Sequence, residues 1–291
     1  MSVADRFRTL LDRVQPSATS KDTFDTHRAS VSSCLRSAFN TAKIELIGSN
    51  ARNTAIGGFS DVDLLLVLRK TEVTWGPSIE SSDTVLKNVR KQLESRFKNT
   101  DIGRDGQAVV VSFRDGDHPV DVVPAFFDGP GRDNYPVFKI PDGAGSWMKT
   151  SPGLHNKYIA EADILSGHKL RSTARLLKFW RTTRTTPLNS FHIELLLAKE
   201  AICTVAKGLS ECLADALQEL TRRECRALQD PMGVSGWIPA ANTDAMRGRA
   251  LASVRDAADH ARRAVEATSW GTFPDAYRQW DIVFNGEFPK S

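Results

Sequence analysis

Residues 61–68 read Asp61-Val62-Asp63-Leu64-Leu65-Leu66-Val67-Leu68, so two acidic residues begin a run of aliphatic side chains. A run this apolar predicts a central strand of a sheet whose two faces are both covered. Successive side chains of a strand point to opposite faces, and Asp61 and Asp63 are therefore expected on the same face. The stretch predicts a sheet that carries a pair of carboxylates at the beginning of its central strand.

A glycine turn precedes this strand. Residues 43–47 alternate polar and apolar side chains and predict a strand that leads directly into Gly48-Ser49. Backbone N–H groups and a serine hydroxyl at such a turn can bind a triphosphate. Gly-Ser is common in ordinary turns, so the dipeptide has weight only together with the acids that follow it.

A third acid stands alone in a second apolar segment, Pro119-Val120-Asp121-Val122-Val123-Pro124. An ionised Asp121 in such a strand needs compensation, because an unpaired buried charge is costly. Coordination of Mg²⁺ or Mn²⁺, which prefer oxygen ligands, would provide it. Asp-x-Asp alone also fits a strand end or a surface hairpin, whereas the ordered set of Gly-Ser, Asp-x-Asp and a later strand Asp predicts a metal site for nucleotide chemistry.

The composition limits the class of protein. A chain of 291 residues with 41% hydrophobic side chains can bury a sizeable core, in one bilobed unit or two domains. A formal charge of +4 suits a protein that handles polyphosphates and lacks the strong basic excess of an obligate nucleic-acid binder. The four cysteines have no Cys-x-x-Cys spacing, which argues against a zinc site or a disulfide framework. We expect free thiols in a reducing cytosol.

No segment predicts a membrane anchor. Residues 1–14 have apolar side chains at helical spacing with charges between them, which indicates an amphipathic helix and not a signal peptide. No run approaches the ~18 apolar residues that a membrane span requires. We expect a cytoplasmic protein.

Helices are predicted in both halves of the chain, and only helices beyond residue 156. The expected helices are 20–42, 82–97, 161–183, 189–207, 210–228, 244–267 and a short one at 274–280. A strand at 107–113 is expected to form a hairpin with the Asp121 strand through a turn at 115–117. Residues 128–153 are rich in Gly, Pro and Asp, and predict a crossing loop and candidate lid.

One helix of the second half carries a basic stripe. In residues 169–181 (KLRSTARLLKFWR), Arg171, Arg175 and Lys178 fall in one sector and apolar residues occupy most of the rest. A helix that is apolar nearly all round is buried, so the stripe must face anionic groups. For Arg171 and Arg175, pairing with carboxylates and contact with phosphate are equally compatible with the pattern.

At three motifs the sequence resembles the bacterial cGAS/DncV-like nucleotidyltransferases (CD-NTases), relatives of oligoadenylate synthase in the polymerase-β-type superfamily. The motifs are residues 47–50 (IGSN), 58–64 (GFSDVDL) and 120–126 (VDVVPAF). The resemblance extends over most of the chain. It implies an α+β fold with a polymerase-β-like core, a mixed β-sheet with helices, plus a C-terminal helical lobe, bilobed with a central cleft. The expected domains are residues 1–155 and 156–291.

The resemblance also implies the site. Asp61, Asp63 and Asp121 would be catalytic and would hold two Mg²⁺ or Mn²⁺ ions, and Gly48 and Ser49 would bind nucleotide. In residues 175–191, Lys178 and Ser190 match residues that hold the donor triphosphate in this family, and Phe191 stands where relatives place a ring against the donor base. Ser190 also fits an ordinary helix start and Phe191 an ordinary core residue.

The implied activity joins nucleoside triphosphates into a cyclic or short linear oligonucleotide second messenger, with release of pyrophosphate, in anti-phage (CBASS) defence. Expected partners are the nucleotide substrates, a downstream effector and regulatory proteins, with no membrane and no obligate nucleic acid. A template-independent RNA terminal nucleotidyltransferase is the first alternative, although no basic appendage supports it. The second is an inactive nucleotide-binding scaffold, which has no chemical need of these three carboxylates.

Overall fold

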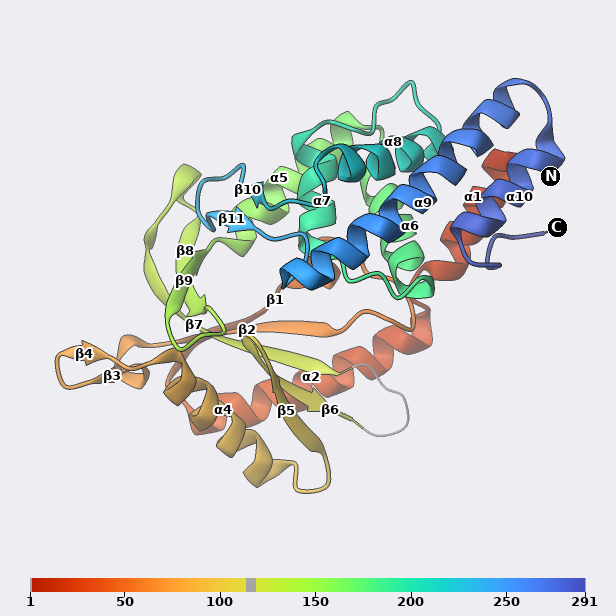
Figure 1. Cartoon of the computed structure of the whole chain (residues 1–291). Coiled ribbons are helices and arrows are strands. Elements are labelled where there is room, and N and C mark those ends of the chain that lie inside the picture. Colours follow the sequence, from red (N-terminus) through yellow and green to blue (C-terminus); the bar gives the residue numbers. More distant parts are fainter. Residues whose placement is uncertain (1, 114–118, 291) are drawn as a thin grey trace. The chain divides into compact units, whose positions relative to one another are not determined.

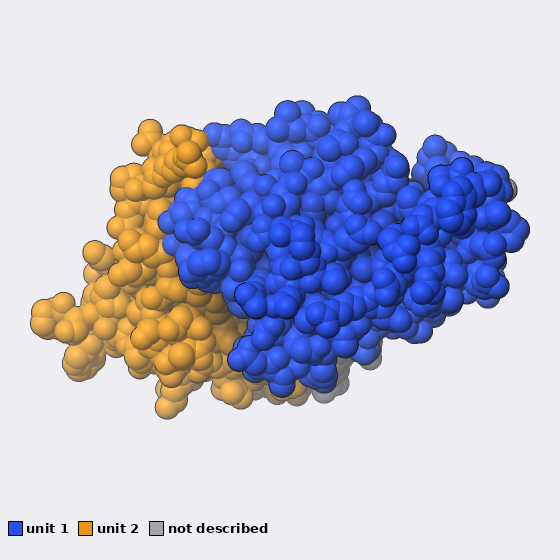
Figure 2. All heavy atoms as spheres, turned by 45° about the horizontal axis from the view of Figure 1, so that its top comes forward, with its two compact units in different colours: residues 1–15, 53–57, 157–291 blue, residues 16–52, 58–156 orange. Residues whose placement is uncertain are grey.

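The computed structural model describes residues 2–113 and 119–290 and forms two compact units. Unit 1 comprises Met1–Gln15, Asn53–Gly57 and Lys157–Ser291, and unit 2 comprises Pro16–Arg52 and Gly58–Asn156; Figure 2 colours them separately. The change of unit after residue 156 lies one residue from the boundary expected from the sequence. The N-terminal helix, however, belongs to the helical unit and not to the sheet unit that follows it.

Unit 2 is built on a seven-stranded mixed sheet with the strand order β1-β2-β7-β6-β5, to which β8 and β9 are added through β7 (Figure 1). Its strands are β1 (Thr41–Leu46), β2 (Val62–Leu68), β5 (Asp101–Asp105), β6 (Ala108–Ser112), β7 (Val120–Pro130), β8 (Pro136–Pro141) and β9 (Trp147–Thr150). The strands β3 (Thr74–Trp75) and β4 (Ser78–Ile79) form a separate hairpin.

The two faces of this sheet are covered differently. The helices α2 (Ala18–Ala38) and α4 (Ser82–Arg96) cover one face (Figure 1). They pack against alternate residues of β2 and β7 that include Leu64, Leu66 and Val122. The intervening residues, Leu65 and Val123 among them, form a smaller cluster with side chains of β8. Both faces of β2 are therefore buried, as its aliphatic run predicts.

The structure corrects the expected loop at residues 128–153. This region completes β7 and forms β8 and β9, which pair antiparallel with each other, while β8 pairs with β7. Pro136 and Pro141, which suggested a loop, lie at the two ends of β8, and Pro152 and Gly153 begin α5 (Pro152–Leu165). Between the two prolines of β8, Phe138 and Ile140 are buried on one face. The region is part of the sheet, and the proposal that it forms a lid is wrong.

Unit 1 is helical apart from a short hairpin of β10 (Leu228–Gln229) and β11 (Trp237–Ile238). Its helices are α1 (Val3–Val14), the C-terminal part of α5 (Pro152–Leu165), α6 (Lys169–Thr183), α7 (Ser190–Lys199), α8 (Leu209–Arg222), α9 (Asp244–Ser269) and α10 (Phe273–Val283). The helices α1 and α10 lie side by side (Figure 1). The rings of Phe7 and Trp280 meet there edge to face, with their centroids 4.9 Å apart. This contact explains why α1 belongs to the helical unit.

The helix expected at 161–183 is two helices, α5 and α6. Gly167 and His168, with φ values of 65° and 63°, reverse the chain between them. The carboxylate of Asp163 then accepts a hydrogen bond from the N–H of Arg171 at 3.0 Å and so caps α6. The predicted 189–207 helix likewise ends early, at Lys199. The apolar periodicity continues through such a break because both helices contribute to one core.

Other expectations are confirmed. The helices expected at the N-terminus, at 82–97 and at 244–267 are present as α1, α4 and α9. Strand β6 pairs antiparallel with β7, as predicted. The predicted turn between them, at 115–117, lies outside the described residues. The cysteines are free thiols. Within residues 2–113 and 119–290, no helix combines the length and the apolar character needed to cross a bilayer.

Candidate active site

The three predicted acids lie at the beginnings of two adjacent strands of unit 2. Asp61 immediately precedes β2, Asp63 is its second residue, and Asp121 is the second residue of β7. The strands are parallel neighbours, so their beginnings lie at the same edge of the sheet, and the Cα atoms of Asp63 and Asp121 are register partners. Asp63 and Asp121 therefore project from the same face, which is the face opposite α2 and α4.

The environment of Asp121 disfavours its negative charge. Burial raises the pKa of its carboxyl to about 7, and the charges of Asp63, Asp61 and Asp105 add to the effect in that order. Its Oδ1 atom is buried and has no hydrogen-bond partner in the described part of the chain. A buried carboxylate oxygen without a partner is an uncommon and costly arrangement. Such an oxygen is suited to a ligand that supplies positive charge.

The donor chemistry fits a hard divalent cation. Three carboxylates at one sheet edge are the oxygen ligands that Mg²⁺ and Mn²⁺ prefer. Within residues 2–113 and 119–290, no three acidic, imidazole or thiol side chains already converge around one point as metal ligands do.

Gly48 makes room for one of the acids. It has a φ of +68°, and a Cβ atom at this position would lie 1.8 Å from Asp63 Oδ2. The N–H of Ile47, one residue earlier, donates to the carbonyl oxygen of Asp63 at 2.9 Å. Gly48 and Ser49 begin α3 (Gly48–Ala51), so the predicted turn is a single helical turn that lies against β2. Only glycine allows the backbone to approach the Asp63 carboxylate this closely.

Two residues near the acids were not predicted as site residues. The Asn50 side-chain amide donates to the carbonyl oxygen of Asp61 at 2.7 Å and so ties α3 to the start of β2. Asp105, at the end of β5, raises the pKa of Asp121. Asn50 lies inside the motif at 47–50, where a closer reading could have assigned it. No sequence pattern around Asp105 indicates a role in the site. Asp105 comes near Asp121 only because β5 pairs with β6 and β6 pairs with β7.

In unit 1, Lys178 is part of a buried ionic cluster. The residue is 2% exposed, and its Nζ donates to the Glu194 carboxylate and to the carbonyl and hydroxyl oxygens of Thr54, at 3.0 and 2.9 Å. The Thr54 hydroxyl in turn donates to Glu194 at 2.7 Å. Glu194 was not predicted, although an acid within the apolar run of α7 is the same kind of signal as Asp121. The role of Lys178 in triphosphate binding stays a prediction.

The other cations of α6 are also held by groups of unit 1. Arg171 forms an ion pair with the buried Asp163 at 3.4 Å. Arg175 donates to the backbone carbonyl oxygens of Asn53 and Ala55, at 2.7 and 3.3 Å. The sequence left open whether these arginines pair with carboxylates or contact phosphate. The structure shows a carboxylate partner for Arg171, whereas Arg175 is held by backbone oxygens.

Ser190 and Phe191 begin α7. Ser190 is the first helical residue, and Asn189 is the N-cap. Phe191 is half-buried and packs against the helical core, as the core alternative predicts. The structure thus groups Gly48, Ser49 and the three acids in unit 2, and Lys178, Ser190 and Phe191 in unit 1.

Comparison with known proteins identifies the class to which this fold and site belong. Residues 1–163 match the family described as the Second Messenger Oligonucleotide or Dinucleotide Synthetase domain. The chain belongs to this family and is a bacterial cGAS/DncV-like nucleotidyltransferase. It is 24% identical over 271 residues to a probable cyclic nucleotide synthase of Bacillus cereus (strain VD146), a match that covers 84% of this chain and 81% of that protein.

Solved structures share the fold. The structure of CdnC from Escherichia coli MS115-1 with ATP matches with a TM-score of 0.75 and 20% identity, over 100% of this chain and 99% of that one. The apo form of Vibrio cholerae DncV matches with a TM-score of 0.72 and 12% identity, over 97% and 93% of the two chains. These matches confirm the α+β, polymerase-β-like architecture.

Proposed function

We propose that this protein joins nucleoside triphosphates into a cyclic or short linear oligonucleotide and releases pyrophosphate. The observation that carries the proposal is the register pairing of Asp63 with Asp121, which project from one face of the sheet at the edge where Asp61 precedes β2. The family match supports the reaction class, since the chain belongs to a nucleotidyltransferase family of cyclic nucleotide synthases.

In this proposal Asp61, Asp63 and Asp121 hold two Mg²⁺ or Mn²⁺ ions. Bound there, the ions would lower the pKa of the attacking ribose hydroxyl and stabilise the charge of the leaving pyrophosphate. Asp121 is the carboxylate that we assign to accept the hydroxyl proton, because its Oδ1 is buried and has no partner among the described residues. Gly48 and Asn50 position the acids, Gly48 by its close approach to Asp63 and Asn50 through the carbonyl oxygen of Asp61.

We assign triphosphate binding to Gly48 and Ser49 of unit 2 and to Lys178 and Ser190 of unit 1, and contact with a base to Phe191. For Lys178 the assignment requires a change of partner, because its ammonium group already donates to Glu194 and Thr54. A nucleotide phosphate would have to compete with the Glu194 carboxylate for this cation. The assignment rests on the sequence motif at 178–191 and not on a free cation.

We further propose that the product is a second messenger in anti-phage (CBASS) defence in the cytoplasm, sensed by a downstream effector. A regulatory partner protein is also proposed. It is supported by the structure of Escherichia coli MS115-1 CdnC in complex with HORMA-deltaN, a chain of the same fold that matches with a TM-score of 0.73.

Incubation of the purified protein with all four α-³²P-labelled nucleoside triphosphates and Mg²⁺ or Mn²⁺ tests the proposal. Cyclisation removes the terminal phosphate, so label that resists phosphatase and migrates as one or a few compact species is the expected result. A ladder of lengthening chains on added RNA would favour the terminal transferase. Metal-dependent nucleotide binding without any product, even in the presence of a partner protein, would favour the scaffold.

A further inference from the structure

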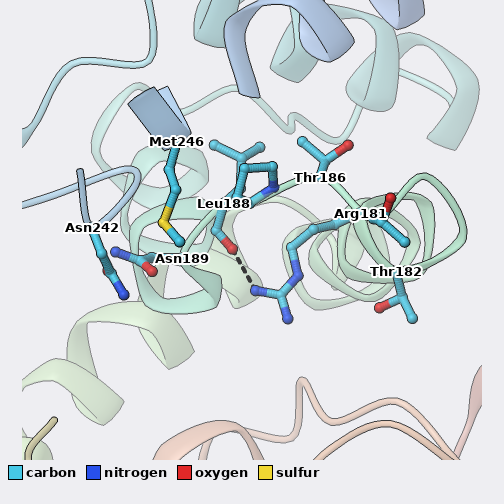
Figure 3. Close-up of a pocket in the computed structure, with 9 residues that line it drawn as sticks. Arg181, Thr182, Thr186, Leu188, Asn189, Asn242 and Met246 are labelled. Carbon is cyan, nitrogen blue, oxygen red and sulfur yellow. Dashed lines mark hydrogen bonds between the residues drawn. The ribbon is translucent and has the colours of Figure 1, made fainter. Parts of the chain in front are cut away.

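Unit 1 contains a cavity of about 430 Å³ formed by the end of α6, the α6–α7 segment and the start of α9 (Figure 3). It is lined by Arg181, Thr182, Thr185, Thr186, Pro187, Leu188, Asn189, Asn242 and Met246. The volume falls in the range of small-ligand sites, which is about 300–1,000 Å³. None of the reactions assigned above uses these side chains.

The lining combines uncharged polar side chains and apolar side chains with a single cation. Two asparagine amides supply hydrogen-bonding groups, while Leu188, Pro187 and Met246 supply apolar surface. The hydroxyls of Thr182 and Thr186 already bond the Lys178 carbonyl oxygen and the Ser253 hydroxyl. No acidic residue lines the cavity, and Arg181 contributes its one charged group. A few hydrogen-bonding groups beside apolar walls are typical of a site for a flat, uncharged ring. The thioether of Met246 is suited to packing against such a ring.

Hydrogen bonds inside unit 1 determine which polar groups can meet a ligand. Asn189 donates its side-chain amide N–H to the Pro239 carbonyl oxygen at 2.8 Å, so Oδ1 is left as its acceptor. Arg181 donates Nη1 to the carbonyl oxygen of Leu188, which holds its guanidinium along the cavity wall (Figure 3). The Asn242 amide makes no hydrogen bond to any other residue that the structure describes, and so offers both a donor and an acceptor.

Asn189 is the N-cap of α7 and directly precedes Ser190 and Phe191, to which we assign nucleotide contacts. We propose that this cavity holds the base of a substrate nucleotide and selects adenine. The inference rests on the proposed function and goes beyond it by naming the base and the residues that choose it.

Adenine fits the available groups better than guanine does. An asparagine amide pairs with adenine through two hydrogen bonds, donating to a ring nitrogen and accepting from the exocyclic amine. Asn242 can make this pair, and Asn189 Oδ1 offers a further acceptor. Guanine recognition would use a forked arginine contact to O6 and N7 or a carboxylate that accepts from its N–H groups. Arg181 already donates Nη1 to the Leu188 carbonyl oxygen, so a fork through both of its Nη atoms would break that bond, and no carboxylate lines the cavity.

Competition between labelled ATP and GTP, supplied together to the full-length protein, tests the inference. The wild type is expected to incorporate adenine in preference. Asn242→Ala should lower the adenine-to-guanine incorporation ratio by about tenfold, since a bidentate contact of this kind discriminates by roughly 5- to 150-fold. Asn242→Asp, which places an acceptor-only group in the cavity, should shift the ratio further toward guanine. Asn88→Ala, at an exposed asparagine of α4, is the matched control and should leave the ratio unchanged.

A binding measurement separates this inference from the proposed function. Calorimetry with non-hydrolysable ATP and GTP analogues needs no turnover. If no product forms under any condition but Asn242→Ala still weakens binding of the ATP analogue selectively, the reaction is wrong and the base pocket stands. Any one of three results would overturn the inference. Asn242→Ala could weaken binding of both analogues equally, or both Asn242 variants could leave the incorporation ratio unchanged. The third result is a wild type that shows no preference for adenine.

Discussion

The Cα atoms of Asp63 and Asp121 are register partners on the adjacent parallel strands β2 and β7. Neighbouring strands lie ~4.8 Å apart, so the two carboxylates project side by side from one face of the sheet. Like charges at this spacing disfavour one another, which contributes to the raised pKa of Asp121. The arrangement is costly without a cation, and the proposed metal ions would offset this cost.

Replacement of Gly48 by alanine is expected to reduce nucleotidyl transfer by about a hundredfold, because displacement of a catalytic group by ~1 Å has an effect of this size. The new Cβ would overlap Asp63 Oδ2, 1.8 Å away, and the carboxylate would have to move. The measurement is the initial rate of pyrophosphate release. Gly76→Ala is the matched control, since Gly76 also has a positive φ of +58° but has open space at its Cβ position. Equal rates for the two variants would contradict the role of Gly48.

Asp121 makes the stability of the metal-free protein depend on pH. Its carboxyl pKa is about 7 in the folded protein, against 3.8 for an ordinary aspartate, so the folded state binds this proton more tightly. The stabilising contribution is complete below pH 3.8 and is lost as the pH rises through about 7. We expect the free energy of unfolding to fall by roughly 2–4 kcal/mol from pH 5 to 8. Asp121→Asn should remove this dependence, and an unchanged pH profile in that variant would refute the assignment.

The Lys178–Glu194 pair is predicted to matter for folding. Lys178→Met leaves a buried, unpaired carboxylate and should destabilise the protein by about 3–5 kcal/mol in urea unfolding. Lys178→Met combined with Glu194→Leu should recover most of this loss, because no charge is left buried. A single variant as stable as the wild type would show that Glu194 is not held as the structure places it.

The same double variant tests the triphosphate role of Lys178 separately from its role in folding. If Lys178 contacts the triphosphate, the folded double variant should bind a non-hydrolysable ATP analogue about ten- to a hundredfold more weakly than the wild type, as expected for the loss of one charge-assisted contact. Calorimetry gives the comparison. Unchanged affinity would assign Lys178 to the buried cluster alone.

Local patterns predicted the strands that carry the acids but not what surrounds them. The alternation at 61–63 places Asp61 and Asp63 on one face because a strand has a period of two residues. That β2 neighbours β7 depends on the sheet topology, which no local pattern specifies. The influence of Asp105 on Asp121 arises through two successive strand pairings, β5 with β6 and β6 with β7. No window of sequence around Asp105 contains that information.

The errors have equally local causes. Gly, Pro and Asp were weighted as loop formers at 128–153, whereas Phe138 and Ile140 alternate into the core and form β8. A continuous apolar period concealed the break at Gly167 between α5 and α6. The stripe on α6 was expected to face anions, and this is confirmed for Arg171 and Lys178 but not for Arg175, which donates to backbone oxygens. Glu194, the partner of Lys178, lies on another helix. Partners brought together by tertiary folding are the part that pattern reasoning could not supply.

The most direct test of the central claim is the rate of pyrophosphate release from nucleoside triphosphates with Mg²⁺, compared between the wild type, Asp63→Asn and Asp101→Asn. Asp101 is an exposed acid on β5 of the same sheet, so its replacement makes the same chemical change away from the paired carboxylates. We predict that Asp63→Asn abolishes release while the protein stays folded, and that Asp101→Asn retains the wild-type rate. Release by Asp63→Asn at the wild-type rate would contradict the account.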